Sequence, residues 1–282
     1  MSKKVPRPRG VDFLINWSMG SWSEDRVLEA INSLEDYVAF RYGVSRAGSF
    51  TWEEFAKYYE RLKRMYLHGK RPDLLVFSRE TYAQLSQKEL QLLSSLMDAS
   101  DAEADPVVEK ALFGIEVEVS RWHVGIMIEY QQKRRTTSIL GPTFTIKEED
   151  IKPLVRWVKD FKKEVVVIQT FYDRAYAITF SCALKLIYAV NSGQKLIGVM
   201  KKRDPKTKKM TYFVSCLKYG KLFGHFDPMP SVEGRVLVDD RGQIWPMISF
   251  VDGKLKITDD ARKLLDEVAT KGILHPDILS KF

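Results

Sequence analysis

The sequence has few of the residues that bind zinc. Its two cysteines, Cys182 and Cys216, and its four histidines are scattered along the chain, without the short repeated spacings of zinc sites. Both cysteines lie in apolar segments, which predicts buried, reduced side chains in a reducing compartment. We therefore expect neither a structural nor a catalytic zinc ion.

Long apolar runs are absent as well. No segment approaches the roughly 18 consecutive apolar residues of a membrane-spanning helix, and the basic residues 1–9 lack the apolar centre of a signal peptide. These absences predict a cytoplasmic protein. The length of 282 residues suits one large domain or two small ones. Because no linker is evident, we predict a single domain over residues 1–282.

Positive charge is in moderate excess. The 45 lysines and arginines outnumber the 37 acidic residues, which gives a formal net charge of +8. Such an excess favours a polyanionic partner through long-range attraction. It identifies no partner by itself, because many proteins of similar charge bind no nucleic acid.

Two short segments are candidates for bringing carboxylates together. Residues 114–120 alternate aliphatic side chains with Glu116, Glu118 and Ser120, which predicts a strand with two carboxylates about 6.6 Å apart on one face. Asp73 precedes the apolar residues 74–77, so we expect it at the start of a buried strand.

If these two strands pair, three carboxylates converge. A hard divalent cation such as Mg²⁺ relieves their repulsion, and such an ion supports phosphodiester hydrolysis. The alternative is that Glu116 and Glu118 line the solvent-exposed face of an antiparallel strand, which is common.

The N-terminal part, residues 1–70, is predicted to be mainly helical. One helix is expected from Ser23 to near Gly43 and a second from Trp52 to about Leu67. Glu29 lies on the first helix, where it either lends a carboxylate to the metal site or is a solvated surface residue.

Residues 71–190 are predicted to form the catalytic core. Helical segments separate the two acidic strands, and residues 98–105 are expected to form a flexible loop. A helix beginning at residue 148 and leading into the buried run 165–171 implies a parallel strand pair. Residues 191–282 are predicted to be rich in short strands and to contribute DNA contacts.

Two polar segments are candidates for contacting nucleic acid. The first follows residues 121–130, which we predict to be extended, and its amide and basic side chains suit bidentate contacts with bases and phosphates, although an exposed loop explains it equally well. The second is the basic tip of a predicted hairpin, where the concentration of charge favours phosphate contact over a solubilising loop. The candidate residues are Gln131, Gln132, Lys133, Arg134 and Arg135 in the first, and Lys201, Lys202, Arg203, Lys206, Lys208 and Lys209 in the second.

The order of these features resembles the PD-(D/E)xK nuclease superfamily, and in particular its type II restriction endonucleases. The resemblance rests on a helix carrying Glu29, the strand entered at Pro72-Asp73, the strand containing Glu116-Val117-Glu118, and a helix followed by a buried strand. Residues 16–25 and 169–176 also look like segments of restriction enzymes, without an assigned role. The resemblance implies an α/β (α+β) fold with a central mixed β-sheet flanked by helices, a restriction-endonuclease-like core and an additional C-terminal β-rich region.

The resemblance gives Asp73 and Glu116 the places of the family's two acids. Glu118 stands where most members have lysine, although a subset of restriction enzymes carries glutamate there and is active. A lysine would steady the attacking hydroxide by its charge, whereas Glu118 has to accept the proton directly or through a second water. Lys147, expected at the start of the following helix, is a candidate for the missing positive charge.

The resemblance implies a homodimeric, Mg²⁺-dependent endonuclease that cuts double-stranded DNA at a specific sequence and leaves 5′-phosphates. Mn²⁺ is expected to substitute for Mg²⁺, and Asp73, Glu116 and Glu118 are the expected metal ligands. A cognate DNA methyltransferase would act in the same prokaryotic restriction-modification system. The alternatives are a structure-specific or repair nuclease of the same superfamily and a non-catalytic basic DNA-binding protein.

Overall fold

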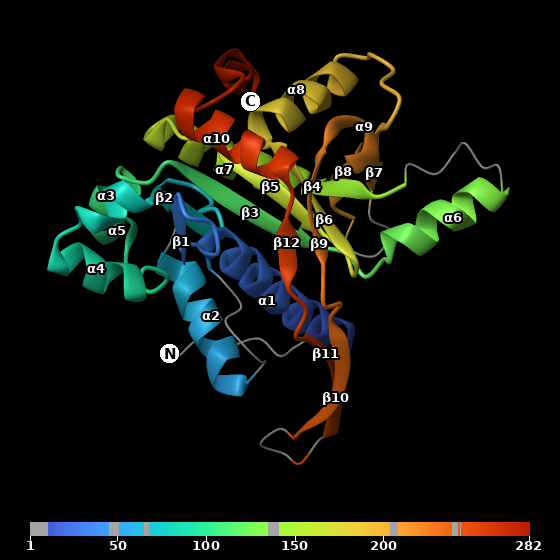
Figure 1. Ribbon diagram of the computed structural model, residues 1–282, viewed down its shortest axis with the longest axis horizontal. Helices are drawn as coiled ribbons and strands as arrows, with labels where there is room; N and C mark the ends of the chain where they lie inside the picture. The colour runs from blue at the N-terminus through green and yellow to red at the C-terminus, as the bar shows by residue number, and fades with distance from the viewer. Residues whose placement is uncertain are drawn as a thin grey trace.

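The computed structural model describes residues 11–44, 51–64, 68–134, 141–203, 208–238, 242 and 244–282. Within these ranges, helices lie on both faces of one large β-sheet (Figure 1). This arrangement confirms the predicted α/β fold with a central mixed sheet flanked by helices.

The central sheet has seven strands in the order β1-β2-β3-β5-β6-β9-β12. Neighbouring strands pair antiparallel except β3 and β5, which run parallel, as the helix preceding the buried run predicts. The strands are β1 (Tyr37–Arg41), β2 (Leu74–Ser78), β3 (Phe113–Val119), β5 (Val165–Thr170), β6 (Arg174–Thr179), β9 (Lys221–Phe226) and β12 (Leu255–Ile257).

Two smaller sheets accompany the central one. The first has the order β4-β8-β7 and contains the predicted basic hairpin, and the second is the pair β10-β11. Their strands are β4 (Thr143–Lys147), β7 (Val199–Arg203), β8 (Met210–Ser215), β10 (Ser231–Val238) and β11 (Ile244–Val251).

The helices divide between the two faces of the central sheet. Side chains of α1 and α10 share a core with one face, and side chains of α7 and α8 share a core with the other. The helices are α1 (Val11–Asn32), α2 (Trp52–Arg64), α3 (Arg79–Ala83), α4 (Gln87–Ser94), α5 (Asp101–Val108), α6 (Val124–Arg134), α7 (Glu148–Phe161), α8 (Phe180–Asn191), α9 (Cys216–Tyr219), α10 (Asp259–Lys271) and the 3-10 helix η1 (Pro276–Lys281). In the part of the chain that the structure describes, none of them has the length and apolarity needed to cross a bilayer.

Strands β2 and β5 are buried on both faces, which explains their continuous apolar sequences. In β2, Leu74 and Val76 face the core of α1 and α10, while Leu75 and Phe77 face that of α7 and α8. All six residues of β5 are buried. The strand entered after Asp73 is therefore fixed from both sides.

The first helix differs from its prediction. It begins at Val11 and ends at Asn32, and Ser23 lies within it, where its hydroxyl hydrogen-bonds that of Thr170 at 2.6 Å. The Asn32 side chain donates to the carbonyl oxygen of Ala39 and accepts from its N–H group. This contact leads the chain into β1, so part of the predicted helix, and of the predicted helical region 1–70, is a strand.

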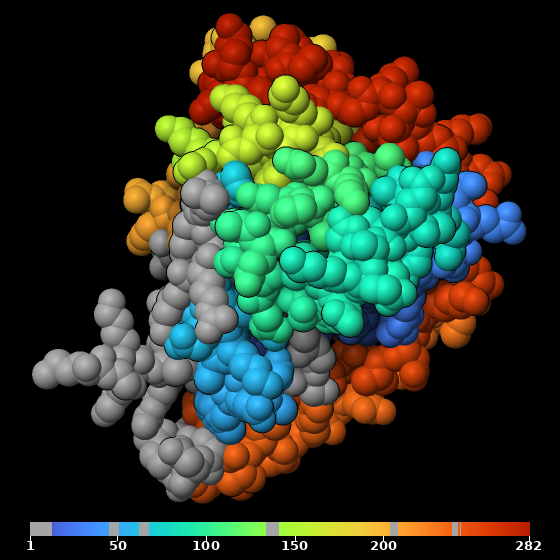
Figure 2. Space-filling model, turned by 90° about the vertical axis from the view of Figure 1, so that its left-hand side faces the viewer, coloured from blue at the N-terminus to red at the C-terminus, as the bar shows by residue number. Residues whose placement is uncertain are grey.

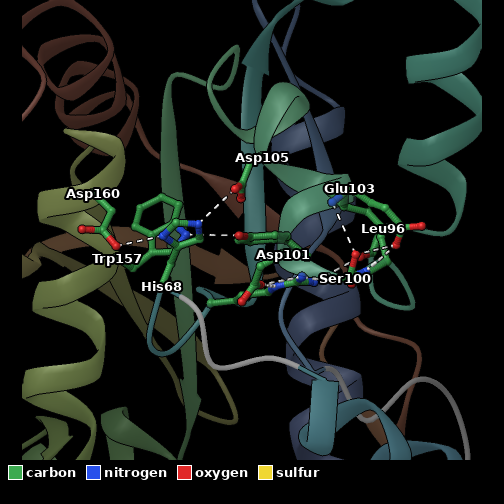
Figure 3. A network of polar contacts seen from close by, with 11 residues as sticks. His68, Leu96, Ser100, Asp101, Glu103, Asp105, Trp157 and Asp160 are labelled. Carbon is green, nitrogen blue, oxygen red and sulfur yellow. Dashed lines mark hydrogen bonds and ion pairs between the residues drawn. The ribbon is translucent and has the colours of Figure 1, made fainter.

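The predicted flexible loop at residues 98–105 is wrong as well, because α5 begins at Asp101. Ser100 accepts a hydrogen bond from the N–H of Glu103, and the Glu103 carboxylate accepts one from the N–H of Ser100. This capping box is visible in the sequence as Ser-x-x-Glu, and Figure 3 shows it at close range. The acidic residues there begin a helix.

Residues 121–130, predicted to be extended, contain most of α6. The cap of this helix comes from a distant residue: the Asp173 carboxylate accepts hydrogen bonds from the N–H groups of Val124 at 2.7 Å and Gly125 at 3.1 Å. Because this cap comes from a residue 49 positions away in the chain, local sequence patterns do not predict it. In Figure 1, α6 projects from the side of the molecule.

Candidate active site

Asp73 stands at the entrance of β2, beside β3. The two strands pair antiparallel with Leu74 opposite Ile115, and the Val117 N–H donates to Asp73 Oδ2 at 2.7 Å. The two acidic segments therefore do pair, which is the condition for bringing their carboxylates together. The pairing brings the Asp73 carboxylate next to the face of β3 that carries Glu116.

Glu116 is deeply buried, with 7% of its surface exposed. Its Oε1 contacts the ammonium group of Lys70. Its Oε2 is buried and has no hydrogen-bond partner among the described residues. A buried carboxylate oxygen without a partner is costly, and a bound cation would remove that cost.

Glu118 and Asp150 form a close cluster with Glu116, and Asp73 stands beside this group and not within it. Lys147 Nζ lies 2.8 Å from Glu118 Oε1, and Lys70 Nζ lies 3.2 Å from Asp150 Oδ2. Carboxyl oxygens of Glu116, Glu118 and Asp150 all lie within 4.8 Å of one another. Asp150 comes from the first turn of α7, where the positive end of the helix favours a carboxylate.

Burial and mutual repulsion raise the pKa values of the two central acids. Burial, and then the charge of Glu24, raises the pKa of Asp73 to about 7. Burial, and then the charge of Asp73, raises the pKa of Glu116 to about 8. Burial acts against the ammonium form of Lys70, but Glu116 and Asp150 nevertheless raise its pKa well above the usual value. Perturbed groups gathered in one cleft are typical of functional sites.

This donor set fits a hard divalent cation. Carboxylate oxygens are the ligands that Mg²⁺ and Mn²⁺ prefer, and the unpartnered Glu116 Oε2 is available to one. Among the neighbouring charges, that of Asp73 does most to raise the pKa of Glu116. A divalent ion bound between them would lower both pKa values.

The segment that carries Lys70 and Asp73 is held tightly. Gly69 has φ +85°, and a Cβ there would collide with the carbonyl oxygen of Pro153. That oxygen accepts a hydrogen bond from the Lys70 N–H at 3.2 Å. Gly114 of β3 is also required, because a Cβ there would overlap the Pro72 ring. The approach of the chain to the site is fixed by close backbone contacts.

Arg71 anchors the same segment to the helices beside it. Its guanidinium is buried, lies 2.7 Å from Asp101 Oδ1, and donates to the carbonyl oxygens of Leu96 and Ala99. The guanidinium also lies 4.8 Å from the centre of the Tyr42 ring. These contacts join Arg71 to the start of α5 and to the turn that precedes it.

His68 makes a second anchor, shown in Figure 3 between Asp105 and Asp160. Its Nδ1 lies 2.8 Å from the Asp160 carboxylate of α7, and its Nε2 lies 3.0 Å from the Asp105 carboxylate of α5. Burial acts against the charged ring, but hydrogen bonds to the two acids raise its pKa. His68 therefore joins α5 and α7 just before the active-site segment. In Figure 2, α2 lies below α4 and α5. The Arg61 side chain of α2 lies 2.6 Å from the Asp98 carboxylate, which precedes α5 in the chain.

The acids open into a cleft of about 1310 Å³. Asp73, Glu116, Glu118 and Asp150 line it, and so do cationic side chains from α7 and from the β7-β8 hairpin. These are Lys152, Arg156, Lys202, Arg203 and Lys209. The cleft thus combines an acidic floor with basic walls.

Residues 2–139 match the AccI restriction endonuclease family. The matched part is just under half of the 282-residue chain and contains Asp73, Glu116 and Glu118. The similarity supports a nuclease that acts on DNA and, more closely, a type II restriction enzyme. Comparisons with curated proteins and with solved structures gave no significant match.

Glu29 lies away from the acids. It is exposed on α1 and forms an ion pair with Arg26 at 2.7 Å. Of the two alternatives, the structure therefore favours a solvated surface residue. Glu24, one and a half turns earlier on the same helix, lines the cleft and raises the pKa of Asp73. The helix does direct a carboxylate toward the site, but from a different residue than the one singled out from the sequence.

The DNA-binding candidates fall into two groups. Lys202, Arg203 and Lys209 line the cleft, whereas Gln131, Gln132 and Lys133 lie on α6 and do not. Lys201 pairs with Glu148 and Lys209 with Glu149, so these two contact acids of α7 in the structure. Lys208 is exposed next to the hairpin. Of the remaining candidates, Lys206 and Arg135, together with the side chain of Arg134, lie outside the described residues.

Sequence reasoning missed Lys70, Asp150 and Glu24. Lys70 precedes Asp73 by three residues, and basic residues before an acidic motif are too common to single out. Asp150 falls in the first turn of the helix predicted from residue 148, where acidic residues are common. Glu24 lies next to Ser23, where the sequence predicts the first helix to begin, whereas α1 begins twelve residues earlier at Val11. Only the tertiary structure brings these three side chains to the cleft.

Proposed function

We propose that the protein is a type II restriction endonuclease of the PD-(D/E)xK superfamily. It would hydrolyse phosphodiester bonds in both strands of duplex DNA at a specific sequence, in an Mg²⁺-dependent reaction. The observation that carries the proposal is the buried, unpartnered Glu116 Oε2, next to Asp73 and at the floor of a cleft with basic walls. The match of residues 2–139 supports the same class of enzyme.

In this proposal Asp73 and Glu116 hold the Mg²⁺ ion, and Mn²⁺ can replace it. When bound, the ion supplies Lewis acidity, activation of a water molecule and charge stabilisation at the leaving oxygen. Glu118 is close enough to Glu116 to share in binding or to orient the attacking water. Glu29 has no part in it.

Glu118 would accept the proton of the attacking water at Oε2, because Lys147 already contacts Oε1. Lys147 thus holds the acceptor in place and contributes the positive charge that lysine provides in most of the superfamily. The water oxygen forms a bond to phosphorus, and the bond from phosphorus to the 3′ oxygen breaks. The leaving 3′ oxygen takes a proton from solvent, and Glu118 returns its proton to solvent, so the products are a 5′-phosphate and a 3′-hydroxyl.

The cationic walls of the cleft would contact the DNA backbone. Each lysine or arginine that neutralises a phosphate releases counterions and makes binding dependent on salt. The β7-β8 hairpin is the best placed of the predicted segments, because Lys202 and Arg203 line the cleft. Gln131 and Gln132 would read bases only where DNA extends beyond the cleft to α6.

A homodimer would match the two-fold symmetry of a palindromic DNA site. The outer face of the β10-β11 pair is suited to such an association, because it exposes a set of aliphatic side chains: Val232, Val236, Val238, Ile244 and Ile248. Apolar faces of this kind are common in protein interfaces. A cognate methyltransferase would protect the host DNA in the same restriction-modification system.

The test is incubation with plasmid and phage DNA in the presence and absence of Mg²⁺, followed by electrophoresis. The wild type is expected to give discrete fragments with Mg²⁺ and none with a chelator. Asp73→Asn should abolish cleavage, because the amide removes a charged ligand, while DNA binding persists in a mobility-shift assay.

Glu29→Gln is the matched control, since it changes an acid of α1 that does not line the cleft, and it should cut at the wild-type rate. A smear or a dependence on DNA forks would favour a structure-specific or repair nuclease. Binding without cleavage by the wild type would favour the non-catalytic DNA-binding protein. Full activity of Asp73→Asn would refute the site assignment.

A further inference from the structure

Lys70 lies inside the carboxylate cluster. Its ammonium group contacts Glu116 and lies 3.2 Å from Asp150 Oδ2. Because oxygens of these two acids and of Glu118 lie within 4.8 Å of one another, the three residues have the spacing of a metal site. Lys70 fills the space between two of them with a fixed positive charge.

The two carboxylate oxygens of Glu116 therefore have different surroundings. Its Oε1 contacts Lys70, whereas its Oε2 is buried without a partner among the described residues. Asp73, whose charge raises the pKa of Glu116, makes no ion pair with any described lysine or arginine. One carboxylate oxygen of Glu116 is thus already paired with a cation, and the other is not.

The balance of charge agrees with this division. When all are ionised, the four carboxylates of Asp73, Glu116, Glu118 and Asp150 and the two ammonium groups of Lys70 and Lys147 leave two negative charges. One divalent cation neutralises that charge. A second would leave the cluster with an excess of positive charge at short range, where like charges repel strongly.

The backbone of Lys70 is also held in place. The Lys70 N–H bonds the Pro153 carbonyl oxygen, Gly69 fits against the same carbonyl, and the neighbouring Arg71 is anchored in a buried ion pair. A metal ion entering between Glu116 and Asp150 would have to displace the ammonium group while the backbone of Lys70 stays fixed.

We propose that Lys70 takes the place of a second divalent cation, so that each chain binds one metal ion, at Asp73 and Glu116. The inference rests on the proposed function, because it assumes a metal-dependent site. Replacing Lys70 by an uncharged residue of similar length would vacate the space between Glu116 and Asp150. The cluster would then accept a second ion there, with Glu118 as a further ligand.

The experiment counts bound Mn²⁺ per chain by equilibrium dialysis of the full-length protein without DNA. The wild type is expected to bind one ion, and Lys70→Met two, with the second at least tenfold tighter than any second ion of the wild type. Lys70→Arg keeps the positive charge and should bind one. Lys152→Met removes a lysine from the same cleft without vacating the space, and it should also bind one.

Asp73→Asn in the wild-type background should lose the single ion. Circular dichroism checks that each variant is folded, and the wild-type count decides the inference even if Lys70→Met fails to fold. Two ions of similar affinity in the wild type, or one ion in a folded Lys70→Met, would overturn the inference and leave the proposed function intact. No ion in the wild type would overturn both.

Discussion

Asp73 carries a charge that the metal-free protein accommodates poorly. Its carboxylate accepts a hydrogen bond from the Val117 N–H, but burial and the charge of Glu24 still raise its pKa to about 7. The same residue is proposed to bind the metal. A site built to hold a cation is therefore a source of instability until the cation arrives.

This predicts a pH dependence of stability in the absence of metal. Because the folded pKa of Asp73 is raised, proton binding contributes stability that is present below the unfolded value near 4 and lost as pH rises through about 7. Asp73→Asn removes the charge and keeps an acceptor for Val117, so with a chelator at pH 8 it should be about 1–2 kcal/mol more stable than the wild type.

Denaturant unfolding at pH 5 and pH 8 measures the effect. The two proteins should differ little at pH 5, and Mg²⁺ should stabilise the wild type at pH 8 but not the variant. Glu29→Gln, which alters an exposed acid, should follow the wild type. Equal stabilities of Asp73→Asn and wild type at pH 8 would show that the charge of Asp73 does not destabilise the folded protein.

The segment from His68 to Asp73 is held in place as a unit because it is tied to two helices, α5 and α7. His68 and Arg71 bind carboxylates of α5, His68 also binds Asp160 of α7, and the Lys70 N–H bonds the Pro153 carbonyl oxygen of α7. These contacts fix the side chains that reach the cleft. The position of the active site thus depends on α5, a helix that makes no contact with the reacting groups in the proposal.

Arg71→Met should strongly destabilise the fold. The change leaves the buried Asp101 carboxylate without its cation and the carbonyl oxygens of Leu96 and Ala99 without their donor. Breaking a buried ion pair by removing one partner costs about 3–5 kcal/mol. Urea denaturation measures the loss.

The control for this variant is Lys271→Met, which removes one partner of an exposed ion pair with Glu267 on α10. It should change the free energy of unfolding by no more than about 0.5 kcal/mol. A loss for Arg71→Met as small as that of the control would mean that the buried pair does not anchor the segment.

At the scale of the whole molecule, the placement of the charges matters more than the net charge. The net charge of +8 is moderate, but cations from α7 and the β7-β8 hairpin meet around one cleft that has an acidic floor. A phosphate backbone would be attracted to the walls and repelled by the floor until a metal ion neutralises it. Binding of DNA and binding of metal should therefore favour each other.

The hairpin is expected to supply part of the electrostatic attraction. Replacing both Lys202 and Arg203 by alanine should weaken DNA binding and reduce the slope of log affinity against log salt by about 1–2. The double variant Arg262→Ala and Lys263→Ala removes the same charge from α10, outside the cleft, and serves as the matched control. Fluorescence anisotropy over a salt series measures both, and identical slopes for the two double variants would argue against the hairpin.

The sequence by itself determined the strand entered after Asp73, the acidic strand β3, the buried strand β5 and the presence of a parallel pair in the sheet, whereas the partners of each strand came from the structure. The strands and the parallel pair follow from local patterns: alternating or continuous apolar residues fix which faces are buried, and the helix before residue 165 requires a crossover. Asp73, Glu116 and Glu118 could be selected because they stand on those strands.

Only the tertiary structure decided the remaining features of the site. The cap of α6 comes from Asp173, the helical acid that reaches the cleft is Glu24, and the cation beside Glu116 is Lys70. Each depends on contacts between residues far apart in the chain, which local periodicity does not encode. A single sequence specifies secondary structure through short-range patterns, whereas the neighbours of a buried charge are set by how the elements pack.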